Sequence, residues 1–164
     1  MQLPEPQEQH RWLLQLVGEW SFEHECNMGP DQPPLKSSGK QTTRSLGDLW
    51  ILGDIVGALP DRTPSYSVIT LGFDIARSRF VGSFIASCMT HFWPYDGSLD
   101  ASGKVLTLDS EGPSFAGDGT MARYQDIIEI IDRDQHTLTS RFQNADGTWT
   151  QFMLGTYRRS KLNE

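Results

Sequence analysis

The residues best suited to chemistry surround position 91. Met89, His91, Trp93 and Tyr95 occur at every second position, and a regular strand places such residues on one face. A thioether, an imidazole, an indole and a phenol on one face suit a planar or apolar ligand, with His91 and Tyr95 fixing its orientation. The plainer alternative is a strand face packed into a core, with its polar tips bonded to backbone groups.

A second set of candidates carries ionisable groups among apolar neighbours. His24 alternates with charged residues and is therefore expected to point inward. Tyr124, Asp126 and Arg141 are candidates to be trapped inside, where an Asp126–Arg141 pair could bind a ligand carboxylate. The alternative is that residues 137–141 form a solvated outer face.

Catalysis and metal binding have weaker support in the residues. An inward His91 or His24 could act as a general base with Tyr124 or Asp126, as in an isomerase or a hydrolase. No Gly-x-Ser-x-Gly elbow or glycine-rich phosphate loop is present. His-x-His and Cys-x-x-Cys spacings are also missing, so no metal site and no cofactor are expected, with haem held by one histidine as the alternative.

These residues are predicted to lie on strands that follow one short helix. Apolar residues at helical spacing predict a helix over 7–17, ended by Gly18. Strict alternation from Glu19 to Cys26 predicts the first strand. Pro94 interrupts a later strand, which implies a bulge or bend there. The remaining strands are expected near 38–47, 49–58, 65–74, 78–88, 91–100, 104–112, 121–132, 136–143 and 148–158.

Ten short strands joined mainly by tight turns predict an all-β fold, a closed antiparallel up-and-down barrel. A two-sheet sandwich would need longer crossover connections. Ten strands in a ring enclose more space than a few side chains fill, so a cavity is expected. The loops 28–37 and 60–64 are predicted to gate its mouth.

Composition limits the location and the partners of the protein. One domain over 1–164 is expected, with a tail at 160–164, and the net charge of −7 disfavours nucleic acid and anionic membranes. Only Cys26 and Cys88 are present, and the N-terminus lacks the features of a signal peptide. A soluble cytoplasmic protein fits these observations, and a homodimer is a candidate assembly.

The order of elements resembles a known superfamily. A short helix, the tripeptide Gly18-Glu19-Trp20 and a meander of strands ending in arginine are similar to the calycins, which include lipocalins and fatty-acid-binding proteins. The resemblance implies that Trp20 packs at the closed end of a barrel, with Arg158 or Arg159 lying across it.

Longer motifs resemble an uncharacterised bacterial family known only as a domain of unknown function. They are His10-x-Trp12-Leu13-x-x-Leu16-Val17-Gly18-Glu19-Trp20, Leu71-Gly72-Phe73-Asp74, Met89-Thr90-His91-x-Trp93-x-Tyr95, Leu108-Asp109-Ser110-Glu111-Gly112-Pro113 and Asp146-Gly147-x-Trp149. This resemblance implies a calycin-like barrel and supplies no catalytic residue.

Binding of a small hydrophobic ligand in the barrel is therefore the favoured function. An enzyme in the same barrel and a structural protein acting through its surface are the alternatives. Haem binding, as in nitrobindin-like barrels, has less support because the closing strand contains no histidine.

Overall fold

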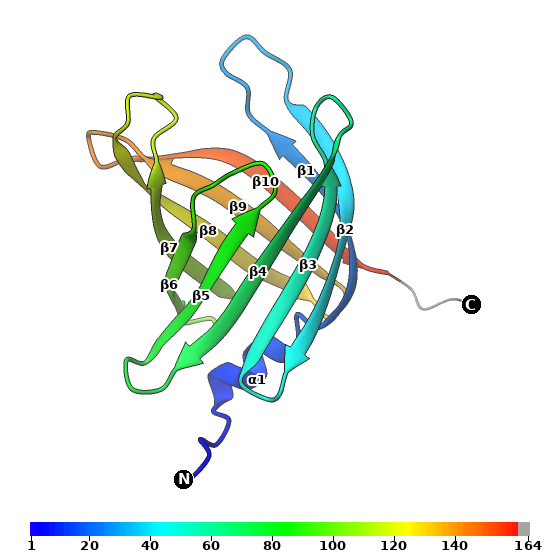
Figure 1. Cartoon of the computed structure of the whole chain (residues 1–164), viewed down its shortest axis with the longest axis vertical. Coiled ribbons are helices and arrows are strands. Elements are labelled where there is room, and N and C mark those ends of the chain that lie inside the picture. The colour runs from blue at the N-terminus through cyan, green and yellow to red at the C-terminus, as the bar shows by residue number, and fades with distance from the viewer. Residues whose placement is uncertain (161–164) are drawn as a thin grey trace.

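Alternating inward and outward residues organise the chain into a ring of strands. The computed structural model describes residues 1–160, in which ten antiparallel strands close into a barrel in the order β1-β10-β9-β8-β7-β6-β5-β4-β3-β2 (Figure 1). Consecutive strands are neighbours throughout, which confirms the predicted up-and-down barrel and excludes the sandwich. The predicted tail beyond Ser160 lies outside the described residues.

The observed elements follow the predicted boundaries closely. They are α1 (Glu8–Leu14), β1 (Gly18–Cys26), β2 (Leu35–Leu46), β3 (Trp50–Ala58), β4 (Pro64–Asp74), β5 (Arg79–Ala86), β6 (Trp93–Leu99), β7 (Val105–Pro113), β8 (Met121–Asp132), β9 (Gln135–Gln143) and β10 (Trp149–Arg159).

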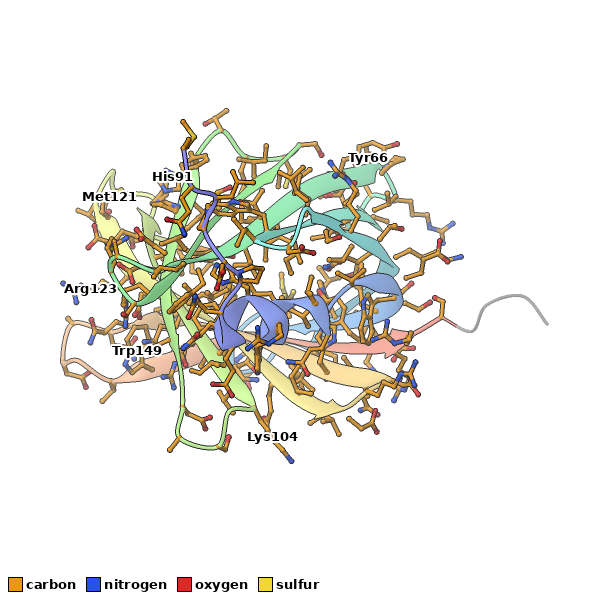
Figure 2. The ribbon with its side chains drawn as sticks, turned by 90° about the horizontal axis from the view of Figure 1, so that it is seen from below. Tyr66, His91, Lys104, Met121, Arg123 and Trp149 are labelled. Carbon is orange, nitrogen blue, oxygen red and sulfur yellow. The ribbon has the colours of Figure 1, made fainter. Side chains whose placement is uncertain are left out.

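Helix α1 is shorter than the predicted 7–17. It ends at Leu14, because the next residues form tighter turns in which the N–H of Leu16 donates to the carbonyl of Leu13 (3.0 Å). Gly18 does not end the helix: it opens β1 with φ +134°, a conformation that favours glycine. Figure 2, which shows the barrel from this end, has α1 lying across the middle of the ring of strands.

The helix is fastened to the barrel by its apolar face and by two side-chain hydrogen bonds. Leu13 is almost completely buried in the main core cluster. The indole Nε1 of Trp12 donates to the carbonyl of Gly103 (2.6 Å), and His10 Nε2 bonds to the carbonyl of Phe73 (3.0 Å). Because a seven-residue helix is marginal by itself, these contacts keep it in place.

Trp20 seals the same end of the barrel. Its side chain is 2% exposed, and its indole Nε1 donates to the carbonyl of Leu16 (2.9 Å). The guanidinium carbon of Arg159 lies 4.3 Å from the centre of the Trp20 ring. The expectation that Trp20 is buried under an arginine of the last strand is confirmed, with Arg159 in that role.

Candidate functional site

The ring of strands encloses a cavity of about 780 Å³. Its deeper wall is apolar and includes Leu16, Ile51, Leu71, Leu108, Ile128 and Leu138. Leu16 comes from the turn between α1 and β1, and the others come from β3, β4, β7, β8 and β9. A space of this size fits a small organic molecule, since ligand pockets range from about 300 to 1,000 Å³.

The mouth lies at the end opposite α1, between the β5–β6 connection and the start of the β7–β8 loop. Residues 88–91 and 113–115 line it. The loops 28–37 and 60–64, predicted as gates, contribute no lining residue among those described. Both loops are at the same end of the barrel, but they stand beside other strands (Figure 1).

Met89 and His91 belong to this connection and not to a strand. β6 begins only at Trp93, so the prediction that all four aromatic and thioether residues share a strand face is wrong for the first two. Both nevertheless line the cavity, and His91 Nε2 is bonded to the carbonyl of Glu111 (2.9 Å). The connection therefore brings them to the wall on which Trp93 and Tyr95 lie.

Pro94 causes no bulge in the described strands. It pairs with Ser83 of β5 in regular register, while pairing with β7 starts at Asp96. Proline has no N–H to donate, so it is tolerated at a position with only one strand neighbour. Trp93 and Tyr95 on either side consequently keep the alternation and point inward.

Tyr95 and Asp126 form the polar centre of the cavity. The Tyr95 hydroxyl donates to one carboxylate oxygen of Asp126, and the Ser140 hydroxyl donates to the other (2.5 Å). Burial raises the pKa of Asp126, against the opposing effect of these two hydrogen bonds. Burial, followed by the charge of Asp126, raises the pKa of Tyr95 well above its ordinary value.

A second polar group lies between the polar centre and Trp20. His24 Nε2 is bonded to the hydroxyl of Tyr157 (2.9 Å), and the ring of His136 stacks on that of Tyr157 with centroids 4.7 Å apart. Burial lowers the pKa of His24 to about 4 and that of His136 also to about 4, the latter with a smaller contribution from Arg159. Both imidazoles are therefore neutral at pH 7.

Trp93, Tyr124 and His91 line the mouth as a packed aromatic group. The Trp93 ring lies edge-to-face against His91 at 4.7 Å and against Tyr124 at 5.0 Å. The Tyr124 hydroxyl donates to the carbonyl of Pro113 (2.6 Å). Among the described residues, neither His91 nor His24 is hydrogen-bonded to Tyr124 or Asp126, the residues expected to act with a histidine base in an enzyme.

Arg141 is not part of this site, contrary to the prediction. Its neighbours in β9, Ser140 and Phe142, alternate with it, and its guanidinium bonds to the Gln125 side chain (2.6 and 2.8 Å) and lies 4.9 Å from the Trp149 ring. The predicted Asp126–Arg141 pair therefore does not form, because adjacent inward and outward positions separate the two side chains.

Sequence reasoning missed several lining residues. His136, Ser140, Tyr157 and Ser110 face the cavity, yet none was a candidate. The alternation His136, Leu138, Ser140 was the available signal. This alternation is hard to recognise in the sequence because β9 carries polar residues on both of its faces.

Three buried polar atoms of this site lack a hydrogen-bond partner among the described residues. They are Trp93 Nε1, Ser110 Oγ and His136 Nδ1. Buried polar atoms normally have a hydrogen-bond partner, so three atoms without one in the same cavity are unusual. All three belong to residues that line the cavity.

The wall around Trp93 depends on a glycine, and substituting that glycine is expected to disturb it. A Cβ at Gly112 would lie 2.1 Å from two atoms of the Trp93 ring. We expect Gly112→Ala to move the indole and to destabilise the fold by about 1–3 kcal/mol. A shift in the tryptophan emission spectrum with a lower urea midpoint would support this expectation. Gly57→Ala in β3 is the control for a general effect of losing a glycine, because a Cβ there would meet no atom closer than 3.6 Å.

Residues 1–160 contain no group of three or more His, Cys, Asp or Glu side chains placed to hold a metal ion. No helix within this range has the length and hydropathy needed to cross a membrane.

The fold and the cavity define a class of ten-strand barrels that enclose space for a small molecule. Over residues 5–159 the sequence matches the family described as protein of unknown function (DUF1579), and the chain belongs to this family. The predicted membership of an uncharacterised barrel family is thereby confirmed. None of the curated proteins matches the chain.

Two solved structures share the fold at low sequence identity. Rv2717c from M. tuberculosis is 12% identical, with a TM-score of 0.61, over 96% of this chain and 100% of that one. EF1p2_mFAP2b, whose structure is bound to DFHBI, is 14% identical, with a TM-score of 0.50, over 92% of this chain and 98% of that one. At these identities the similarity shows the fold alone.

Proposed function

We propose that the protein binds a small, largely apolar molecule inside the barrel. The observation that carries the proposal is the cavity of about 780 Å³, lined mainly by aliphatic and aromatic side chains. Protein interiors are usually packed to a density that leaves few voids larger than a water molecule. A bound molecule accounts for a space this large better than a packing defect does.

The lining offers the few polar contacts that orient a ligand in such pockets. Trp93 Nε1 and Ser110 Oγ, on the neighbouring strands β6 and β7, and His136 Nδ1, closer to Trp20, are without partners in the described chain. Leaving a buried polar group unpaired costs about 1–3 kcal/mol, and a bound ligand that pairs with it recovers this energy.

Seven of the eight residues expected from the sequence belong to the proposed site. They are Met89, His91, Trp93, Tyr95, His24, Tyr124 and Asp126. The EF1p2_mFAP2b barrel, which is bound to DFHBI, supports the capacity of a similar fold to hold a small molecule. A cytoplasmic location is part of the proposal, and the free thiols of Cys26 and Cys88 are consistent with it.

The test is a titration with Nile red, a neutral planar dye that becomes fluorescent in apolar surroundings. We expect saturable binding by the wild type. Filling the cavity with Ile69→Trp should weaken the affinity at least about tenfold, a change of about 1.4 kcal/mol.

The matched control is Val68→Trp, which introduces the same side chain one position earlier. Successive residues of a strand point to opposite faces, so this tryptophan faces away from the cavity and should leave the dye affinity unchanged. Equal affinities of the two variants, or no saturable binding by the wild type, would contradict the proposed function.

A further inference from the structure

The cavity wall is distinguished by the charges it lacks. Among the described lining residues there is no lysine or arginine, and Asp126 is the one acid. Burial keeps two of the lining histidines, His24 and His136, neutral at pH 7. The third lining histidine, His91, lies at the mouth, with its Nε2 bonded to the carbonyl of Glu111. A molecule deeper in the barrel therefore meets no lysine, arginine or charged histidine that could compensate a carboxylate.

Arg141 and Arg159 are held outside the cavity by contacts of their own. Arg141 lies on the outer face with Gln125 and Trp149. Arg159 lies across Trp20, and its guanidinium donates to the carbonyls of Val17 (2.7 Å) and Gln15 (3.1 Å) at the closed end. Because Trp20 separates it from the cavity, Arg159 is also not available to a ligand.

Asp126 retains capacity to accept hydrogen bonds. A carboxylate has about four acceptor positions, and the hydroxyls of Tyr95 and Ser140 occupy two of them, one on each oxygen. The other positions can take an N–H or O–H of a molecule in the cavity. A buried carboxylate without a cationic partner is costly, so a ligand that brings a donor or a positive charge is favoured.

We propose, building on the proposed function, that the cavity selects neutral or singly cationic apolar molecules that carry an N–H or O–H donor, and that it discriminates against carboxylates such as free fatty acids. Asp126 accepts the hydrogen bond from the ligand's donor. Tyr95 and Ser140 hold the carboxylate in position for this contact. The apolar wall packs against the rest of the ligand and adds no further selection by charge.

Three ligands with the same chain test the selection: dodecan-1-ol, dodecylamine and dodecanoate, each displacing Nile red at pH 7.5 and below its critical micelle concentration. For the wild type we expect the alcohol and the amine to displace the dye at concentrations at least about tenfold lower than dodecanoate. Native mass spectrometry of the same mixtures gives the stoichiometry, which should be one ligand per cavity.

Asp126→Asn should reduce the ratio of amine affinity to dodecanoate affinity by about tenfold or more, because the negative charge is removed. The alcohol should still bind, because the asparagine carbonyl can accept its hydrogen bond. If this variant fails to fold, Ser67→Arg adds a cation to the β4 wall of the cavity and should strengthen dodecanoate relative to the amine by a similar factor.

Equal or tighter binding of dodecanoate than of the alcohol by the wild type would overturn the proposed selection while leaving ligand binding intact. An unchanged amine-to-dodecanoate ratio in a folded Asp126→Asn or Ser67→Arg protein would also overturn it. A different result is that Nile red fails to bind the wild type and native mass spectrometry finds none of the three dodecyl ligands bound, which removes the proposed function and the selection together.

Discussion

Replacing Trp20 with alanine is expected to lower the free energy of unfolding by about 3–5 kcal/mol, the range found for large aromatic side chains removed from a core. The ring is 2% exposed and packs edge-to-face on His136 with centroids 4.4 Å apart. The substitution also leaves the carbonyl of Leu16 without its indole donor and removes the ring beneath the Arg159 guanidinium. Urea unfolding followed by circular dichroism measures the loss.

Trp50→Ala is the matched control for this experiment. Trp50 is 41% exposed on the outer side of β3, where its ring lies over Gly72. Its removal deletes the same number of atoms from a site that water already reaches, so the loss should be less than half that of Trp20→Ala. Similar losses for the two variants would show that Trp20 does not seal the barrel in the way its burial indicates.

Stability is expected to fall by about 3–4 kcal/mol between pH 7 and pH 5, through His24 and His136 together. Each has a pKa of about 4 in the folded protein, below the ordinary histidine value of 6.5. Between these two values the unfolded chain binds a proton at each site and the folded protein does not, so lowering the pH favours unfolding. The stabilising contribution is complete above pH 6.5 and is lost towards pH 4.

Asp126 acts in the opposite direction in part of this range. Its pKa is raised in the folded protein, so the folded state takes up a proton at a higher pH than the unfolded chain does. This uptake stabilises the folded protein as the pH falls and reduces the observed slope. The two histidines still determine the direction of the pH dependence, because two protonation sites destabilise the folded protein at low pH and one stabilises it.

Urea unfolding of the wild type, His24→Gln and His136→Gln at pH 8, 7, 6 and 5 measures these contributions. The difference between a variant and the wild type at pH 8 reports lost packing, since neither state binds a proton to these imidazoles there. The loss of unfolding free energy between pH 7 and pH 5 reports titration, and each substitution should make this loss smaller by about 2 kcal/mol, the contribution of one histidine. An identical slope in all three proteins would contradict neutral burial of the two rings.

The barrel was predictable because its signals are local and repeat along the chain. Alternation from Glu19 to Cys26 assigns His24 to the inner face, and turn residues separate the later strands. Tyr124 and Asp126 were candidates because they are ionisable groups among apolar neighbours, and both line the cavity. Odd and even positions of a strand lie on opposite faces, so two residues can be assigned to the same or opposite faces without knowing what the strand packs against.

The site was predictable only where a residue's face follows from its own strand. Met89 and His91 reach the cavity from a connection whose path depends on where β5 ends and β6 begins. The pairing of Asp126 with Tyr95 and Ser140 joins three strands, and the register between them decides it. Arg141 was assigned wrongly because its charge suggested a partner for Asp126, whereas its position beside Ser140 places it outside.

A closed ten-strand barrel was predictable from the sequence, because strand alternation and turn chemistry are properties of short segments. The place of Trp20 at the closed end was implied by the resemblance to the calycins. Three features required the three-dimensional structure: the interior is open, its described lining residues include one acid and no lysine or arginine, and Arg159 is the arginine over Trp20. Ring closure fixes these features, since the size of the cavity and the meeting of distant side chains depend on the register of all ten strands at once.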